Sequence, residues 1–222
     1  MQLSENTLNI LKNFASINQG IVVSPGNKIR TINTFRTILA DAEVDETFPT
    51  AFKLYDLNKV LSAIDKNTKE IVFERDHLSI NSIGNIRIRY SDGVGITAPP
   101  DKSIVMKDTI ATAKISAETV RWIFTCASIL KCPNIVIKCA GEDQPITIWA
   151  MDVDGAIVDD AYTEIPGEST AAFEIVILMQ NLNIIQGGYD VKISQGVLEF
   201  KHTTHKVTYW ITTEKKKGKK HG

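Results

Sequence analysis

The sequence lacks the short motifs that carry most enzyme chemistry. It has no G-x-x-x-x-G-K-[ST] phosphate loop, no G-x-G-x-x-G after an apolar strand and no nucleophile turn of the G-x-S-x-G type. His202 and His205 form H-x-x-H without the H-E-x-x-H spacing of zinc proteases, and solvent-facing histidines on a strand or turn are the simpler interpretation. The segment Met151–Gly155 resembles a calcium loop, but its glycine comes too early and no glutamate closes it. We therefore expect no catalytic residues, no metal and no cofactor.

Cysteine is scarce, and long apolar runs are missing. The three cysteines are an odd number without a C-x-x-C pair, which favours buried, reduced thiols over a disulfide framework. No stretch approaches the ~18 apolar residues that a membrane-spanning helix needs, and the first residues do not resemble a secretory leader. We expect neither a membrane span nor export.

Charge is nearly balanced over the chain but unevenly placed. The 222 residues carry a net charge of −1, yet five lysines fall within residues 215–220. Without them, 20 basic residues face 26 acidic ones, a net charge of −6 for Met1–Glu214. A lysine-rich tail is a common nucleic-acid footprint, but this one has nothing apolar, and we expect residues 215–222 to be disordered. The acidic body could bind DNA only with its cations gathered on one face.

Apolar periodicity predicts a repeating unit of one helix followed by three strands. Helical spacing begins after the candidate N-caps Ser4, Asp56 and Ser116, and a weaker, uncapped helix begins near Met179. The intervals between these starts are 52, 60 and roughly 63 residues. Strand-like alternation follows each start, so we interpret the chain as four copies of one unit.

One such unit cannot cover its own apolar face, so two are expected to form a domain. The Gly- and Pro-rich stretch Ser91–Thr109 is typical of a linker. The predicted domains are therefore residues 1–92 and 111–214, joined by a linker at 93–110 and followed by the tail at 215–222. Helices on antiparallel sheets give an α+β fold class.

The residues also resemble a known family. The N-terminal segment is similar to the start of the sliding clamp of T-even-type bacteriophages, the DNA polymerase processivity factor. Twelve of the first 21 residues match: Leu3, Ser4, Thr7, Leu11, Lys12, Asn13, Phe14, Ala15, Ile17, Asn18, Gly20 and Ile21. Tyr55–Asn58 with Leu61 resembles that clamp's second helix, and Gly188–Tyr189 fits the turn after its fourth. Two features depart from the family: the linker is shorter, and the lysine tail has no counterpart.

The resemblance implies a DNA-clamp fold of two similar domains, each with two helices packed on antiparallel sheets. Three subunits would form a homotrimeric ring with helices lining the central channel and sheets outside. The implied partners are encircled duplex DNA, the viral DNA polymerase and an ATP-driven clamp loader, and the implied location is the cytoplasm of the infected bacterial host. A role in late viral transcription would also follow. The four predicted helices per chain would place twelve around such a ring.

Two sets of site residues follow from this comparison. The polar faces of the predicted helices offer five cations to a DNA channel: Lys12, Lys59, Lys66, Arg121 and Lys131. Ordinary complementarity to helix dipoles explains the same cations without DNA. A pocket for partner peptides, as the family has near the linker and the last strand, has four candidates: Val105, Met106, Tyr209 and Ile211. A core strand and a gap-filling methionine are the alternative interpretation of these four.

Two other function classes stay open on the sequence. A ring-forming structural or assembly protein of a virus particle would show the same repeats without any DNA function. An enzyme without recognisable motifs is the third candidate. A clamp would be a non-enzymatic scaffold whose binding depends on the topology of the DNA.

Overall fold

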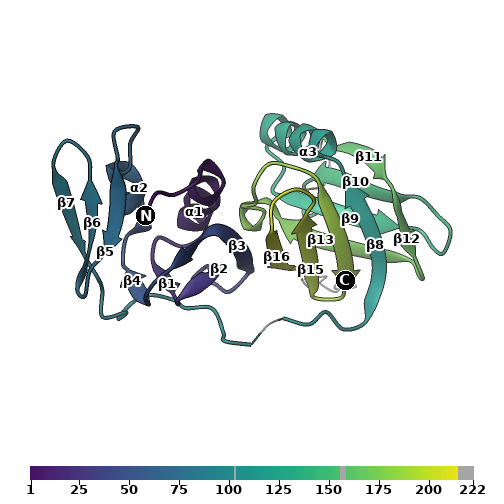
Figure 1. The fold of residues 1–222 in the computed structure, drawn as a ribbon. Helices are drawn as coiled ribbons and strands as arrows, with labels where there is room; N and C mark the ends of the chain where they lie inside the picture. The colour runs from purple at the N-terminus through teal and green to yellow at the C-terminus, as the bar shows by residue number, and fades with distance from the viewer. Residues whose placement is uncertain (103, 156–158, 215–222) are drawn as a thin grey trace. The chain divides into compact units, whose positions relative to one another are not determined.

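The chain folds into two compact units. The computed structural model describes residues 1–102, 104–155 and 159–214 (Figure 1). The first unit comprises Met1–Lys102 with His205–Val207, and the second comprises Ser103–Thr204 with the segment from Thr208 onward. The predicted disordered tail lies outside the described residues. Each unit is described here by itself.

Three helices begin where the sequence predicts. They are α1 (Glu5–Ile17), α2 (Leu57–Ala63) and α3 (Ala117–Leu130). The side chains of Ser4, Asp56 and Ser116 each accept a hydrogen bond from a backbone N–H of the first turn, at Thr7, Asn58 and Thr119. These bonds satisfy N–H groups that have no partner inside the helix. The three predicted N-caps are therefore confirmed.

The start of α1 is fixed to strand β3 (Ile38–Phe48) by one carboxylate. Glu46 accepts hydrogen bonds from the backbone N–H of Ser4 and from the hydroxyl of Thr7, and Thr7 is fully buried. A carboxylate near a helix N-terminus also interacts favourably with the helix dipole. Glu46 thus positions α1 on the sheet that it covers.

We expect Glu46→Gln to lower the free energy of unfolding of the first unit by about 2 kcal/mol, because a charged acceptor of two hydrogen bonds is lost. Chemical denaturation followed by circular dichroism measures the change. Glu5→Gln is the matched control, since it removes the same charge from the first turn of α1, where Glu5 is exposed. Equal losses for the two variants would show that charge alone, rather than the hydrogen bonds, matters at Glu46.

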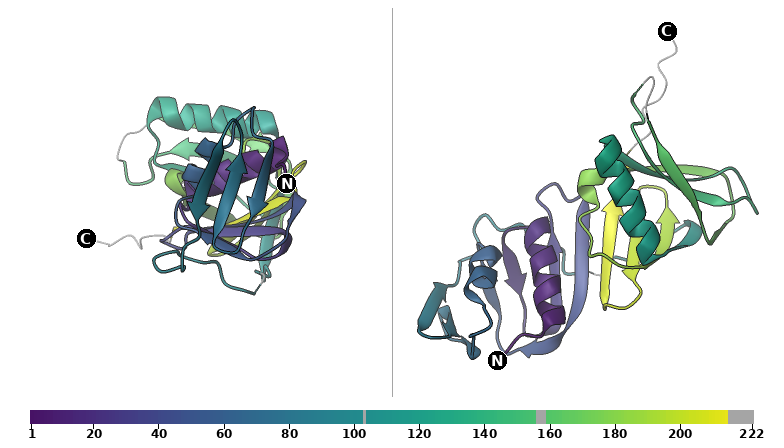
Figure 2. Two further views of the ribbon diagram at one scale, coloured as in Figure 1. Left: turned by 60° about the vertical axis from the view of Figure 1, so that its left-hand side comes forward. Right: turned by 90° about the horizontal axis from the view of Figure 1, so that it is seen from above.

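All strand pairs of the first unit are antiparallel. The strand β1 (Ile21–Val23) pairs with β4 (Phe52–Leu54), and β2 (Gly26–Ile32) pairs with β3. A separate three-stranded sheet has the order β5-β6-β7, built from Glu70–Phe73, His77–Asn81 and Asn85–Arg89. Helices α1 and α2 pack against each other beside these strands (Figure 2). Ring contacts among Phe48, Phe52, Phe73 and Tyr90 fill the space near β4 and β5.

The second unit contains two antiparallel layers. One layer is the four-stranded sheet β11-β10-β9-β13, whose strands are Ala161–Ile165, Ile146–Met151, Asn134–Cys139 and Phe173–Leu178. The other runs β12-β8-β14-β15-β16, whose strands are Gly167–Ser169, Thr109–Ile115, Tyr189–Ser194, Val197–His202 and Val207–Thr212. Helix α3 packs on β10 and β11. Strands β8, β10 and β16 alternate buried residues with more exposed ones, as a sheet with one covered face requires.

The predicted fourth helix is wrong. Met179–Asn181 form only one turn of 3₁₀ helix, and the following residues to Gly188 run without helical structure. Local sequence accounts for this, because asparagines, β-branched isoleucines and Gly187–Gly188 all disfavour a continuing helix. Two buried phenols hold the segment instead: Tyr189 donates to the carbonyl of Ile185, and the N–H of Ile185 donates to the hydroxyl of Tyr209.

Three strands were not predicted. They are β4, β8 and β12, and β8 begins at Thr109 inside the stretch that the sequence suggests as a linker. Strand β12 depends on Gly167, since a Cβ there would lie 2.4 Å from the carbonyl oxygen of Thr112 on β8. Close backbone approach of this kind leaves no room for a side chain.

Much of the predicted linker lies against the first unit. The side chain of Asn18 donates to the carbonyl of Thr97, Arg30 donates to the carbonyl of Pro100, and the N–H of Ser91 donates to the carbonyl of Lys53. These bonds hold residues 91–100 to the strands and to the end of α1. The domain bounds drawn from the sequence stay a prediction.

Candidate DNA-facing surface and partner contacts

The five cations proposed for DNA contact are all exposed and come from both units. Lys12 lies on α1, Lys59 on α2, and Arg121 on α3. Lys66 follows α2 in the turn Asp65–Thr68, and Lys131 is the C-cap of α3, with φ at 56°. Each helix buries its apolar stripe, so Lys12, Lys59 and Arg121 lie on helical faces directed away from the sheets.

None of these five cations forms an ion pair within the described part of the chain. Other cations do: Lys192 lies 2.9 Å from Glu199, and Arg30 lies 3.2 Å from Asp41. An unpaired surface cation keeps its full charge available to a phosphate, whereas a paired one is partly neutralised. The helical faces are therefore suited to weak, sequence-independent attraction for a polyanion.

The exposed face of α3 is not purely basic. Trp122 and Ile129 lie on it two turns apart, with exposed fractions of 41% and 71%. Glu118 is exposed in the first turn. Neither apolar residue belongs to the stripe that the sequence assigns to the core, so sequence periodicity alone did not single them out.

Carboxylates lie near Cys132, which follows the C-cap Lys131 of α3. The thiol of Cys132 donates a hydrogen bond to the carbonyl of Asp159. Burial raises the pKa of the Cys132 thiol, and the nearby carboxylates of Asp152, Asp160 and Asp159 raise it further.

The four candidates for a partner-peptide pocket separate into two groups. Val105 is 75% exposed and Met106 is half-buried, so both are available at the surface. Tyr209 and Ile211 are fully buried in β16, which corrects their assignment to a surface pocket and agrees with the core-strand alternative. Burial also raises the pKa of Tyr209, as expected of a phenol inside the core.

A preformed turn in the first unit presents an aromatic residue that the sequence did not single out. Asn33 accepts hydrogen bonds from the N–H groups of Thr37 and Ile38 and donates to the hydroxyl of Thr37. Between them, Phe35 is 84% exposed and Arg36 adopts a left-handed conformation at φ 57°. Asparagine is common in turns between strands, so Asn33 is the residue from which the sequence could have predicted this turn.

A groove of about 780 Å³ lies in the second unit. Its walls are β8, β12 and the loop between β9 and β10, and its charged residues are Glu142, Asp143 and Glu168. No histidine, cysteine or lysine is among the residues that line it. The described residues contain no group of three potential metal ligands and no helix suited to cross a bilayer.

His202 of the H-x-x-H pair does not face solvent, contrary to the interpretation drawn from the sequence. His202 is only 5% exposed rather than solvent-facing, and its ring packs edge-on against Tyr189. The N–H of Thr204 donates to Nδ1 of His202, at 3.1 Å. That bond requires Nδ1 to be an acceptor and fixes the residue in a structural role in its turn.

Comparison with solved structures identifies the fold. The chain is similar to PCNA from Thermococcus kodakaraensis, with a TM-score of 0.66 and 12% identity over 93% of this chain and 95% of that one. It is also similar to the PCNA2–PCNA3 complex from Sulfolobus tokodaii, with a TM-score of 0.68 and 13% identity over 94% of this chain and 96% of that one. The protein therefore has the DNA-clamp fold.

Sequence comparison then shows which DNA clamps the chain resembles. The chain is 26% identical to the sliding clamp of Vibrio phage KVP40, covering 96% of this chain and 99% of the relative. It is 29% identical to the sliding clamp of Escherichia phage RB69, covering 96% and 97%. No family model matches the chain. The resemblance seen in the sequence is confirmed: over nearly its whole length, the chain is similar to the sliding clamps of T-even-type phages.

Proposed function

We propose that three copies of this chain form a closed ring that encircles duplex DNA and tethers the replicative polymerase of a phage. The similarity to phage sliding clamps over nearly the whole chain carries this proposal. The unpaired cations on helices of both units support it. In this function the protein is a non-enzymatic scaffold, and persistence on DNA comes from enclosure rather than from tight chemical contact.

The helices supply the contact with DNA. Lys12, Lys59, Lys66, Arg121 and Lys131 would face the channel and attract phosphates without reading sequence. Few cations per subunit suit this task, because many strong phosphate contacts would stop the ring from moving. The net negative charge of the rest of the chain keeps the attraction local.

Partner proteins (clients) would dock on the outside of the ring. Val105 and Met106 stay the proposed contacts near the linker, whereas Tyr209 and Ile211 are core residues rather than part of the contact surface. The rigid turn that presents Phe35 and Arg36 is a second candidate, since aromatic and arginine side chains dominate protein interfaces. The polymerase, an ATP-driven loader in the infected host cell and late-transcription factors are the proposed clients.

Two assays together test this function: measurement of the mass in solution, and primer extension by the polymerase. The chain at micromolar concentration should have the mass of three subunits, and with the cognate loader it should lengthen the products made by the polymerase in one binding event. A ring-forming structural protein of the virus particle would assemble but leave product length unchanged. A monomer at all concentrations would exclude the ring.

A further inference from the structure

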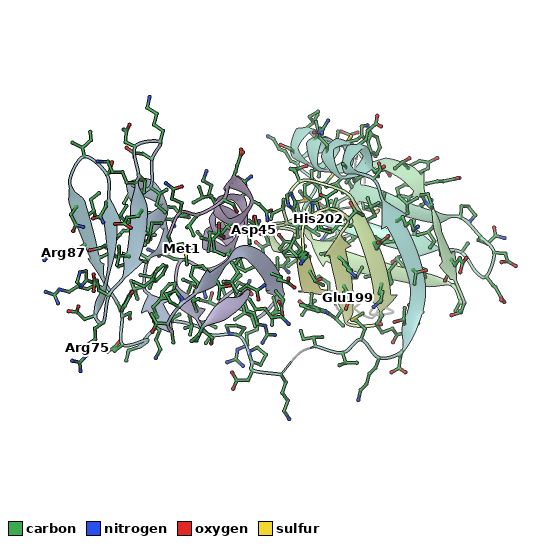
Figure 3. All side chains as sticks on the ribbon, viewed as in Figure 1. Met1, Asp45, Arg75, Arg87, Glu199 and His202 are labelled. Carbon is green, nitrogen blue, oxygen red and sulfur yellow. The ribbon has the colours of Figure 1, made fainter. Side chains whose placement is uncertain are left out.

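The acidic groove of the second unit has no cation of its own. Its three groove carboxylates, Glu142, Asp143 and Glu168, are exposed, and neither lysine nor arginine is among the residues that line it. None of the three forms an ion pair within the described part of the chain. By contrast, Glu199 on β15, labelled in Figure 3, lies 2.9 Å from Lys192. The groove therefore keeps the charge of all three carboxylates available to a cationic partner.

Two hydroxyl groups of the groove are also suited to accept hydrogen bonds. The hydroxyl of Ser169 donates to the carbonyl of Ala171, and the hydroxyl of Thr170 donates to the carbonyl of Ile110. Because each hydroxyl has a single proton, its oxygen can only accept from a further partner. A lysine ammonium has three donors and no acceptor. The groove thus suits ammonium groups, whereas the described residues contain no group of three potential metal ligands.

The last described residues lie close to one wall of this groove. The N–H of Thr213 donates to the carbonyl of Gly196, in the turn between β14 and β15. Two residues before Gly196, Ser194 pairs with Thr109, which lines the groove. From the spacing along a strand and between paired strands, this wall lies about 12 Å from Gly196. The chain after Thr213 therefore starts within a few residues' reach of the groove.

A second hollow lies between the end of the described chain and the groove. The N–H of Glu214 donates to the carbonyl of Val176 on β13. Phe173, nearer the start of the same strand, lines a hollow of about 380 Å³. This hollow adjoins the groove, because Gln144 and Pro145 line both. A segment that leaves Glu214 along β13 therefore meets the groove by a second route.

The residues that follow carry the opposite charge. Five of the six residues 215–220 are lysines, and we refer to these six as the lysine tail. When extended, six residues span about 20 Å, which exceeds the separation of about 12 Å between Gly196 and the groove wall. A short covalent tether also holds the lysines near the groove at a millimolar effective concentration. Length, point of attachment and charge therefore all suit the groove.

We propose that the lysine tail binds in the acidic groove of its own chain, with its ammonium groups on the groove carboxylates. Lys217, Lys219 and Lys220 are far enough from Glu214 along the chain to reach these carboxylates. Exposed ion pairs contribute little individually and are screened by salt, so the bound tail exchanges readily with the free tail. The contact lies within one chain and goes beyond the proposed function, since it does not depend on a ring.

Binding in the groove limits the attraction of the lysine tail for DNA. A free lysine-rich segment attracts phosphates without reading sequence, and this attraction would slow a protein that has to move along DNA. The groove carboxylates compete with phosphates for the same ammonium groups. The groove therefore lowers non-specific binding by the tail and leaves the contact with DNA to cations elsewhere on the chain.

Chemical crosslinking of the full chain tests the contact directly. A carbodiimide joins an ammonium to a carboxylate without a spacer, and mass spectrometry of the digested protein locates the joined residues. The lysine tail should be joined to the groove carboxylates at least about fivefold more often than to Glu118 or Asp190, which are exposed carboxylates of the same unit. An even spread over exposed carboxylates would overturn the proposal. Crosslinks that form only between isotope-labelled and unlabelled chains would overturn the assignment to the same chain.

Neutralising the groove tests the effect on DNA binding. The triple variant Glu142→Gln, Asp143→Asn and Glu168→Gln should bind a short linear duplex at least about fivefold more tightly at low salt, because the lysine tail is released. With all five tail lysines also changed to glutamine, the same three substitutions should alter the affinity by less than about twofold. Fluorescence anisotropy of a labelled duplex measures both affinities.

A matched control removes the same charge from the first unit. Glu5→Gln, Glu74→Gln and Asp101→Asn together neutralise three exposed carboxylates away from the groove. This variant should change the affinity for the duplex by less than about twofold, because the lysine tail stays bound in the groove.

The outcomes distinguish this inference from the proposed function. If the groove variant and the control gain affinity equally, general charge explains the gain and the groove does not hold the lysine tail. If the groove substitutions act equally with and without the tail lysines, the proposal is likewise overturned. Neither result bears on the ring, whose mass is measured separately. A chain that stays monomeric would exclude the ring and still bind its own tail.

Discussion

Replacing four helical cations with glutamate should shorten the residence of the ring on closed circular DNA by at least about tenfold, with the ring itself intact. The residues are Lys12, Lys59, Arg121 and Lys131. Each substitution turns an attraction for phosphate into a repulsion, and a ring of three would carry the change twelve times. Because the four side chains are exposed and make no ion pairs in the described structure, their loss should not unfold the subunit.

A filter or gel-exclusion assay on nicked circular plasmid measures this residence after loading. The matched control replaces four exposed lysines away from the three helices with glutamate, namely Lys69, Lys107, Lys114 and Lys201. This control changes the net charge equally but should retain most of the residence time. Sedimentation confirms that both variants remain rings.

The comparison separates two explanations of the helical cations. If the helix variant and the control lose residence equally, general charge governs retention, and the helices do not face DNA. If neither loses residence, the channel assignment fails although the ring survives. The dipole alternative predicts instead that the helix variant loses stability and keeps its residence on DNA.

Alkaline pH should destabilise the second unit strongly above about pH 10, where phenols ionise in the unfolded chain. Burial raises the pKa of Tyr189 and of Tyr209 far above the ordinary value of 10.0. The neutral phenol is the form that the folded state accommodates, so the stabilisation is complete below pH 10. It is lost as pH rises above 10, since the unfolded chain then releases protons that the folded chain keeps.

Each of these two phenols should cost about 1.4 kcal/mol of unfolding free energy per pH unit in that range. Urea denaturation between pH 8 and 11 measures the slope. Tyr189→Phe should reduce the alkaline slope by about half and cost about 1 kcal/mol at neutral pH through the lost hydrogen bond to Ile185. Tyr55→Phe changes an exposed phenol and should leave the slope unchanged. A slope equal in all three proteins would contradict the role of the buried phenols.

Local chemistry made the three capped helices predictable. A serine or aspartate directly before a helical apolar stripe typically caps the N-terminus of the helix. The structure shows this capping at Ser4, Asp56 and Ser116. The same patterns placed Lys12, Lys59 and Arg121 on exposed helical faces. The DNA-clamp fold followed from residue matches concentrated in the first 21 positions, which comparison with phage clamps confirms.

Features that depend on distant contacts were not predictable in the same way. The prediction of a fourth helix was wrong because two tyrosines from separate strands hold Ile185 in a non-helical segment, and no local pattern reveals such partners. Tyr209 and Ile211 alternate as a core strand does, yet only the packed structure shows that they are fully buried. The places of β7 and β11 at the borders of their sheets likewise follow only from the order of strands, which local sequence does not give.

Retention on circular DNA before and after a single cut in both strands tests the central claim most directly. A ring that encircles DNA should remain on the closed circle at salt concentrations that dissociate ordinary phosphate contacts, and should leave within seconds once the circle is linearised, by sliding off the ends. The cut changes neither sequence nor charge, so only topology differs between the two measurements. Equal retention on circle and linear DNA, weakening identically with salt, would contradict enclosure and with it this account of the protein.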